Sequence, residues 1–192
     1  MAPSADRIDG RREMAATVLV AFASKHGSTK AIAQAVGSKL HSAGLRVRVL
    51  PASVVRDLSG YDAVVVGSAI YHNQWLWDGF RFVRRLKGQL RERPVWLFSS
   101  GPIGGTPSQD NLAKARCGVD TPVPDTLVPS LRNLDYCGHA TFGGRVDDRA
   151  AGIFERYVPH GDWRDFDLVR AWARGIGRHP AFAEPTRDRA AN

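Results

Sequence analysis

Residues Ala21 to Val36 read AFASKHGSTKAIAQAV and pass from an apolar segment into a helical pattern through six small or polar residues. The apolar segment, residues 17–23, is nearly continuous, which is typical of a strand covered on both faces. After Ser28, apolar residues recur at every fourth position, at Ile32, Val36 and Leu40. This stripe predicts a helix that stops near Gly44. The stretch therefore predicts a strand, a short loop and a helix in succession.

The alternation of strands and helices continues along the chain. Residues 45–49 alternate apolar and charged side chains, which predicts a half-exposed edge strand, whereas 63–66 are continuously apolar and predict a central one. Two further strands are predicted at 95–98 and, more weakly, at 139–142. Apolar stripes predict helices between Leu76 and Leu90 and between Phe166 and Ile176, the second capped by Asp165.

This order of elements predicts an α/β fold with a mostly parallel sheet and helices on both faces. Five strands with the second at an edge suit the order 2-1-3-4-5. In that order strands one and three are neighbours whose connections leave in opposite directions, so their carboxyl ends open a crevice where ligands bind. The loops at this crevice are predicted at 24–29, 68–73 and 99–105.

One domain is expected over residues 15–178, with disordered extensions at 1–14 and 179–192 and an alternative start at Met14. Residues 101–130 are rich in Pro and Gly, which predicts a long irregular insertion with one short helix near 110–115.

Composition narrows the classes of protein. No apolar run approaches the ~20 residues of a membrane span, and the N-terminus lacks the apolar core of a secretory signal, so we expect a cytoplasmic location. Cys117 and Cys137 are too far apart for a CxxC redox or zinc pattern, and no metal site is expected. The net charge of +8 suits an anionic partner, but its arginines are scattered and no aromatic and basic platform points to nucleic acid.

The loop after the first strand is suited to hold a phosphate. It consists of Ser24, Lys25, His26, Gly27, Ser28 and Thr29. Backbone N–H groups at a helix N-terminus are unpaired and carry the positive end of the helix dipole. The loop is neither GxxxxGK[ST] nor GxGxxG. A structural turn with a Ser or Thr N-cap explains the loop equally well, so both interpretations stay open on these residues alone.

Three segments in chain order resemble the flavin loops of the flavodoxin family. They are SKHGST at 24–29, GSAIYH at 67–72 and FSSGP at 98–102. GSAIY and the later GDWRDF, residues 161–166, resemble the branch that includes menaquinone-dependent protoporphyrinogen oxidase. The likeness covers roughly residues 15–178 and implies a flavodoxin-like three-layer sandwich with FMN as cofactor.

The resemblance also implies which residues bind FMN. The loop at 24–29 would hold the phosphate, through Ser24, Lys25, His26, Gly27, Ser28 and Thr29. The second segment would meet the ribityl chain and one ring face, through Ser68, Ala69, Ile70 and Tyr71. The third would meet the ring edge, through Ser99, Ser100, Gly101 and Pro102. No catalytic side chain is implied, because the flavin performs the chemistry.

The function implied is that of an FMN-dependent oxidoreductase acting on a flat quinone or porphyrinogen. The third loop contains no aromatic residue, so one ring face could be covered by Tyr71, Trp75 or Trp77 and the other left open for a substrate. We expect Tyr71 to be the ring neighbour and one tryptophan to be structural.

Two alternatives stay open: a one-electron carrier between partner proteins, and a flavodoxin-like binding module that has lost FMN. Electron-transfer flavodoxins are typically acidic, so this basic chain should dock on different redox partners. Weak attraction of the C-terminal arginines to an anionic lipid surface is also expected.

Overall fold

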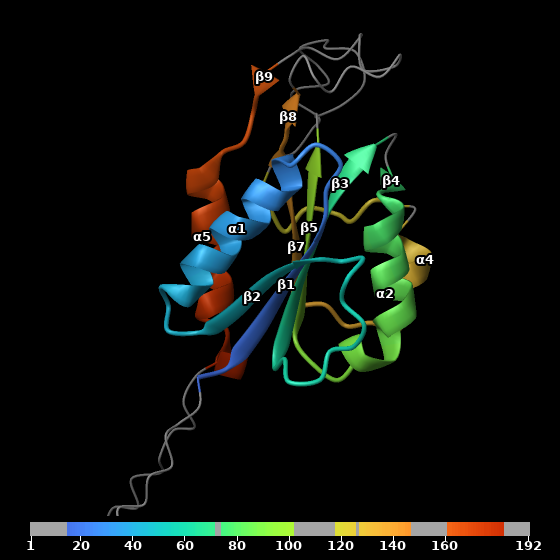
Figure 1. Ribbon diagram of the computed structural model, residues 1–192, viewed down its shortest axis with the longest axis vertical. Helices are drawn as coiled ribbons and strands as arrows, with labels where there is room; N and C mark the ends of the chain where they lie inside the picture. Colours follow the sequence, from blue (N-terminus) through green and yellow to red (C-terminus); the bar gives the residue numbers. More distant parts are fainter. Residues whose placement is uncertain (1–14, 72–73, 102–117, 126, 147–160, 183–192) are drawn as a thin grey trace, which may run out of the picture.

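A parallel sheet forms the centre of the computed structural model, which describes residues 15–71, 74–101, 118–125, 127–146 and 161–182 (Figure 1). Its parallel strands are β1 (Thr17–Ala23), β2 (Arg46–Pro51), β3 (Ala63–Tyr71), β5 (Val95–Gly101) and β7 (Gly138–Gly143). They lie in the order β2-β1-β3-β5-β7, which confirms the predicted order 2-1-3-4-5 and the edge position of the second strand.

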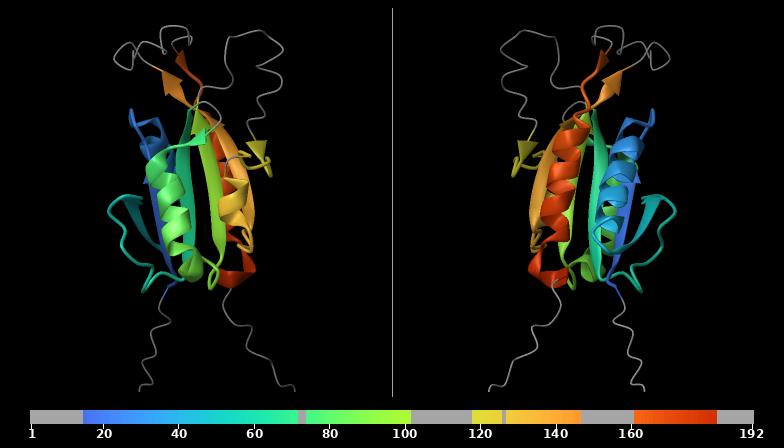
Figure 2. Two further views of the ribbon diagram at one scale, coloured as in Figure 1. Left: turned by 90° about the vertical axis from the view of Figure 1, so that its right-hand side faces the viewer. Right: turned by 90° about the vertical axis from the view of Figure 1, so that its left-hand side faces the viewer.

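Helices cover both faces of this sheet, which confirms the three-layer arrangement (Figure 2). The helices α1 (Ser28–His41) and α5 (Phe166–Gly177) lie on one face. The helices α2 (Trp77–Leu90) and α4 (Val128–Leu131) lie on the other. No helix in the described ranges is both long and apolar enough to cross a bilayer.

Alternating side chains of the strands build two separate cores. In β1, Val18 and Val20 contact the core under α1 and α5, whereas Leu19 and Ala21 contact the core under α2 and α4. All four side chains are fully buried. The continuous apolar run of β1 therefore follows from its place between two helical layers.

The ends of the helices have local causes. Gly27 precedes α1 with a φ of +86°, and Gly44 follows it with a φ of +90°, a conformation that residues with a Cβ rarely adopt. Asp165 caps α5, because its Oδ1 accepts hydrogen bonds from the backbone N–H groups of Asp167 and Leu168, each at 2.9 Å. The predicted stop at Gly44 and the predicted cap at Asp165 are confirmed.

Short elements extend the predicted fold. The strand β6 (Gly118–Val119) pairs antiparallel with β7, and β4 (Gln74–Trp75) folds back antiparallel on the end of β3. A separate two-stranded sheet joins β8 (Arg145–Val146) to β9 (Gly161–Asp162). The segment 101–130, predicted to be irregular, thus contributes β6 and the start of α4.

Several predictions of boundaries differ from the structure or fall outside it. The strands β3 and β5 continue to Tyr71 and Gly101, so the predicted loops at 68–73 and 99–105 begin later than expected. The short 3-10 helix η3 (Pro180–Phe182) lies beyond the boundary set at 178, and Phe182 stacks on Trp96 with ring centroids 5.9 Å apart. The predicted helix near 110–115 and the extension 1–14 lie outside the described residues.

Gly67 in β3 is required by close packing. A Cβ built at Gly67 would overlap the ring of Phe98, which is fully buried in β5. Overpacking of a core typically costs about 1–3 kcal/mol, so Gly67→Ala should lower the free energy of unfolding in denaturant titrations by about 2 kcal/mol or more.

A matched control is Gly88→Ala on α2, where a Cβ would meet nothing within 4 Å. Alanine has the higher helix propensity, so this variant should be more stable than the wild type by up to about 1 kcal/mol. Equal effects of the two substitutions would contradict the packing argument.

Candidate functional site

The candidate site lies at the carboxyl edge of the sheet, where β1 and β3 run side by side. Ala23 at the end of β1 pairs with Ser68 of β3, and Ser68 pairs in turn with Ser99 of β5. The helices that follow β1 and β3, α1 and α2, lie on opposite faces (Figure 1). The chain therefore diverges at this edge, which is where ligands bind in open α/β sheets.

An open hollow of about 290 Å³ lies at this edge. That volume includes space open to solvent, so the hollow is a surface depression and not an enclosed cavity. The residues that line it come from the β1–α1 loop, the ends of β3 and β5, and the segment after β7. They are Ser24, Lys25, His26, Ser28, Thr29, Ala69, Ile70, Tyr71, Ser100, Gly101, Gly144 and Arg145.

The start of α1 is available to an anion. No side chain caps its first turn, and that turn contains no acidic residue. The Ser24 side chain instead stabilises the turn of the preceding loop, because its Oγ accepts a hydrogen bond from the backbone N–H of Gly27 at 3.0 Å. The positive end of the α1 dipole therefore faces the hollow without a carboxylate of its own.

Two hydroxyl contacts fix the start of α1 against the sheet. Thr29 and Ser100 share a buried hydrogen bond between their hydroxyls at 2.8 Å, which joins α1 to β5. Ser28 Oγ accepts the backbone N–H of Arg145 at 3.1 Å, which joins α1 to the segment after β7. Because a ligand cradle needs fixed donors, these contacts preorganise the loop.

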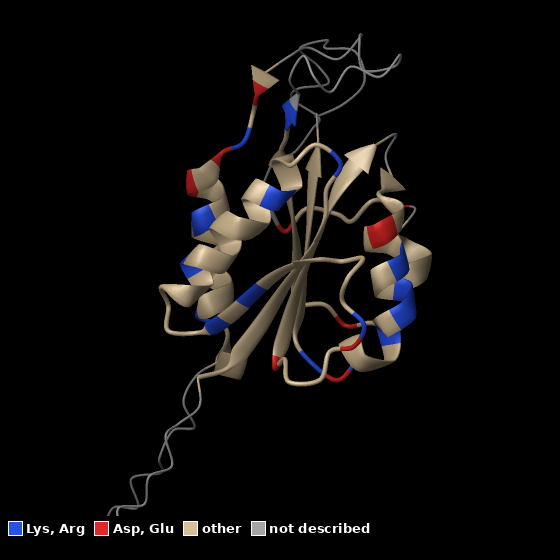
Figure 3. Cartoon of the chain, in the orientation of Figure 1, with Lys and Arg blue, Asp and Glu red and all other residues tan. Residues whose placement is uncertain are grey.

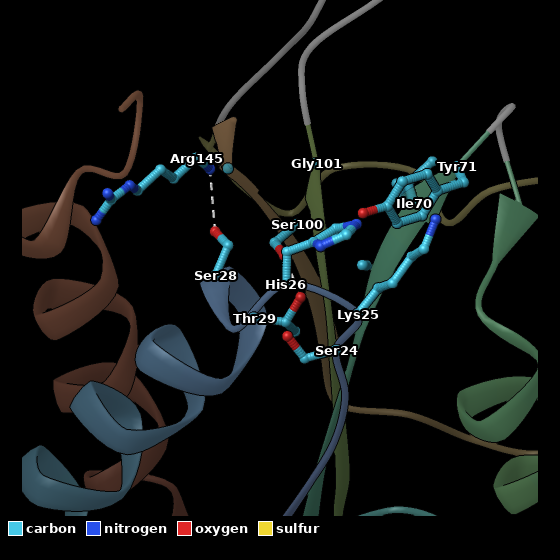
Figure 4. Close-up of a pocket in the computed structure, with 12 residues that line it drawn as sticks. Ser24, Lys25, His26, Ser28, Thr29, Ile70, Tyr71, Ser100, Gly101 and Arg145 are labelled. Carbon is cyan, nitrogen blue, oxygen red and sulfur yellow. Dashed lines mark hydrogen bonds between the residues drawn. The ribbon is translucent and has the colours of Figure 1, made fainter. Parts of the chain in front are cut away.

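Positive charge and one aromatic ring lie at the other side of the hollow (Figure 4). The Nζ atom of Lys25 lies 5.4 Å from the centroid of the Tyr71 ring, a cation–π distance. His26 also points toward Tyr71, whereas the side chain of Arg145 extends away from it. The lining contains no carboxylate, so this set of side chains favours an anionic ligand.

The acidic residue near Arg145 already has a cationic partner. Asp162 of β9 accepts a hydrogen bond from Arg164 Nε at 2.7 Å. That hydrogen bond, with a smaller contribution from the charge of Arg145, holds the pKa of the Asp162 carboxyl below its ordinary value. Asp162 therefore stays ionised and paired beside the basic edge of the site.

Not every predicted binding residue lines the hollow. Ser68 Oγ accepts the N–H of Leu76 and donates to the carbonyl of Ala69, so its hydroxyl holds the start of α2. Ser99 is likewise buried on the α2 side. Gly27 serves the loop through its left-handed backbone, and Pro102 lies outside the described residues.

Gly144 and Arg145 belong to the lining but were missed by the sequence analysis. A Cβ at Gly144 would come within 3.1 Å of the Gly101 backbone, so the two chain segments touch there. The available signal was the pair of glycines at the end of the fifth parallel strand, with Gly143 as the last residue of β7 and Gly144 directly after it. In a parallel sheet that position shares an edge with the ends of all the other strands.

A buried chain of hydrogen bonds lies beneath the site. Trp75 Nε1 donates to Ser99 Oγ at 2.8 Å, and Ser99 Oγ lies 2.9 Å from His139 Nε2. His139 Nδ1 lies 2.9 Å from the carbonyl oxygen of Thr121, which can only accept. The hydrogen of His139 is therefore on Nδ1, and Nε2 accepts from Ser99. Trp75, which is buried in β4, is the tryptophan with the expected structural role.

Comparisons with known proteins agree on the fold. The family model described as the flavodoxin domain matches residues 19–158. A similar solved structure is a flavodoxin from the domain Archaea, with 16% identity, 84% of this chain and 96% of that chain covered, and a TM-score of 0.56. Oxidised Flavodoxin 1 from Bacillus cereus gives 13% identity, coverage of 85% and 99%, and a TM-score of 0.54.

A larger protein also contains a similar fold. Rubredoxin oxygen:oxidoreductase from Desulfovibrio gigas gives 19% identity and a TM-score of 0.54, with 86% of this chain but only 37% of that chain covered. No curated protein matches the chain significantly. At these sequence identities the solved structures establish the fold only. The function has to be argued from the residues of the site.

The buried histidine predicts how stability depends on pH. Burial lowers the pKa of His139, and its hydrogen bonds to backbone carbonyls offset only part of that effect. Below the ordinary histidine pKa of about 6.5, the unfolded chain binds a proton more readily than the folded one. Thermal unfolding should therefore show stability falling as the pH drops from 7.5 to 5.5, by linkage.

The variant His139→Gln should lose about 1 kcal/mol at pH 7.5 from the broken hydrogen bonds and respond less to pH in this window. His41→Gln, at the exposed end of α1, is the control and should keep most of the wild-type response. A pH response unchanged in His139→Gln would rule out His139 as its source.

Proposed function

The chain belongs to the flavodoxin domain family, and on that premise we propose that it binds FMN at the carboxyl edge of the sheet as an oxidoreductase. The observation that carries the proposal is the uncapped start of α1, which faces a hollow lined by hydroxyls and cations. The proposal keeps the cytoplasmic location expected from the sequence.

The residues present fit the phosphate of FMN. Backbone N–H groups of the first turn of α1, together with Ser24 and Ser28, supply donors at the positive end of the helix dipole. The left-handed backbone of Gly27 lets the loop bend into that turn. Phosphate would find both charge and donors there, with no carboxylate in the lining to repel it.

The residues around Tyr71 fit one face of a flavin ring. Tyr71 is the aromatic residue of the lining, and aromatic rings stabilise a stacked ring through contact area and quadrupole. Ala69, Ser100, Gly101 and Gly144 add only small side chains. Among the described residues the lining therefore supplies one aromatic wall, which leaves room for a flat substrate.

We further propose a flat substrate, a quinone or a porphyrinogen. When bound, FMN would supply the transfer of two electrons and the accompanying protons, with position and electrostatics supplied by the chain. Lys25 and His26 would stabilise negative charge that develops on a ring beside Tyr71. The proposal extends to the protoporphyrinogen oxidase branch, which rests on the segments GSAIY and GDWRDF.

The phosphate site is tested by Ser28→Asp. A carboxylate at the first residue of α1 suits the helix dipole, so the fold should keep its stability, but the carboxylate would repel a phosphate. Binding of FMN, followed by quenching of flavin fluorescence, should weaken by at least about tenfold. Binding of riboflavin, which has no phosphate, should change little.

The matched control is Ser59→Asp, which adds the same charge at an exposed turn before β3. It should bind both flavins like the wild type. Equal losses for FMN and riboflavin in Ser28→Asp would place the phosphate elsewhere, and a wild type that takes up neither flavin would leave the binding-module alternative.

The ring site and the chemistry are tested by Tyr71→Ala. Loss of the aromatic wall should weaken FMN binding by roughly 1 kcal/mol or more and change the visible absorbance envelope. In the FMN-loaded wild type, reduced without oxygen, a soluble quinone should accelerate reoxidation.

Tyr136→Ala, at a half-exposed tyrosine outside the lining, should behave like the wild type. If quinone leaves reoxidation no faster than buffer, the oxidoreductase proposal fails. Reductive titration in two separate one-electron steps would then support the carrier alternative.

A further inference from the structure

The helix α2 presents a row of side chains that neither the fold nor the candidate site uses. Its inner face buries Phe82, Val83, Leu86 and Leu90 in the core beneath it. Its outer face carries residues at alternating spacings of four and three, which fall on one line along a helix. These residues are Trp77, Arg81, Arg84, Gly88 and Arg91, called here the α2 row.

The aromatic end of the α2 row is exposed. Trp77 is 60% exposed, the highest fraction among the large hydrophobic side chains in the described ranges. Its ring stacks on Phe80 with centroids 5.8 Å apart, and the guanidinium of Arg84 lies 5.9 Å from the centroid of Phe80. Aromatic and cationic groups are thus held together on the surface with no other element above them in the described structure.

The cations of the α2 row are not neutralised. Arg81, Arg84 and Arg91 are exposed, and no ion pair joins them to a carboxylate in the described part of the chain. Asp78 and Glu92 lie at the two ends beside the row, and Glu92 pairs with Arg93. Figure 3 shows Lys and Arg following one another along α2, and Asp78 is the acidic residue of its first turn.

The row starts beside the candidate site. Trp77 follows β4 after one residue, and β4 pairs Gln74 with Tyr71 of β3. From Trp77 to Arg91 the row runs about 21 Å along the helix at 1.5 Å per residue. A partner on this row would therefore lie next to the Tyr71 side of the hollow.

We propose that the α2 row is a docking surface for an anionic lipid bilayer. A straight, convex row of cations matches a flat anionic surface, whereas a protein hot spot centres on side chains buried in a well-packed pocket. Tryptophan is enriched where protein meets the headgroup region of a membrane. Charge complementarity and the exposed Trp77 together favour a lipid surface over a protein partner. Docking by this row does not depend on flavin binding.

The proposal is tested by sedimentation of the full chain with vesicles. Phosphatidylcholine vesicles with about 30% phosphatidylglycerol should bind the wild type at low salt, with binding lost as salt rises. Pure phosphatidylcholine vesicles should not. Since each cation at an anionic surface is worth a factor of roughly five, the triple variant Arg81→Gln, Arg84→Gln, Arg91→Gln should bind at least about tenfold more weakly.

A control variant with the same loss of charge separates the α2 row from overall charge. Arg48→Gln, Arg174→Gln and Arg178→Gln remove three exposed arginines from β2 and from the end of α5. This variant should lose much less affinity than the row variant. The emission of Trp77, isolated as the difference between wild type and Trp77→Phe, should shift to shorter wavelength on the acidic vesicles.

Three outcomes would overturn the proposal. One is absence of binding to acidic vesicles at low salt, and another is an equal loss of affinity in the two triple variants. The third is retention on a polyglutamate resin that depends on the row while vesicles fail to bind, which would assign the surface to an acidic protein.

Discussion

The parallel pairing of β1 with β3 is the constraint on which the site depends. Ala23 opposite Ser68 places the ends of the two strands at one level, and the helices that follow them pack on opposite faces. If β1 and β3 were not adjacent in the sheet, the start of α1 would lie far from Tyr71. The two buried cores specify this register, because a shift by one residue would move every apolar side chain of a strand to the opposite face.

Polar contacts at the carboxyl edge supplement the apolar cores. The hydrogen bond between Thr29 and Ser100 lies on the α1 side, and the chain from Trp75 through Ser99 to His139 lies on the α2 side. Adjacent residues of β5 thus serve opposite layers, because side chains alternate along a strand. In the described part of the chain no buried side-chain polar atom lacks a partner, so this edge is ordered at little energetic cost.

Positive charge has two separate places in this molecule. Lys25 and Arg145 belong to the lining of the hollow, where the Lys25 side chain extends toward Tyr71 and that of Arg145 extends away from it. The cations of the α2 row lie on the outside of a different layer, where they are exposed and form no ion pair in the described structure. A net charge of +8 did not distinguish these two roles, since composition records neither distance nor direction.

The sequence by itself determined the layers, the strand order and most of the lining. Continuous and alternating apolar runs distinguish central from edge strands, and the residues from Ser24 to Thr29 mark a phosphate-suited turn before a helix. These features are local, so residues close in the chain carry the signal. The short β4 and β6 strands, by contrast, have two residues each and no periodicity of their own, so only their pairing with β3 and β7 defines them as strands.

Only the tertiary structure decided which hydroxyls face the hollow and which support it. Ser99 and Ser100 are identical in the sequence, but Ser99 contacts Trp75 and His139 whereas Ser100 contacts Thr29. Gly144 and Arg145 join the site because β7 lies next to β5, more than forty residues away in the chain. Such contacts depend on which face a strand presents and on which strands are neighbours, and both are set by packing in three dimensions.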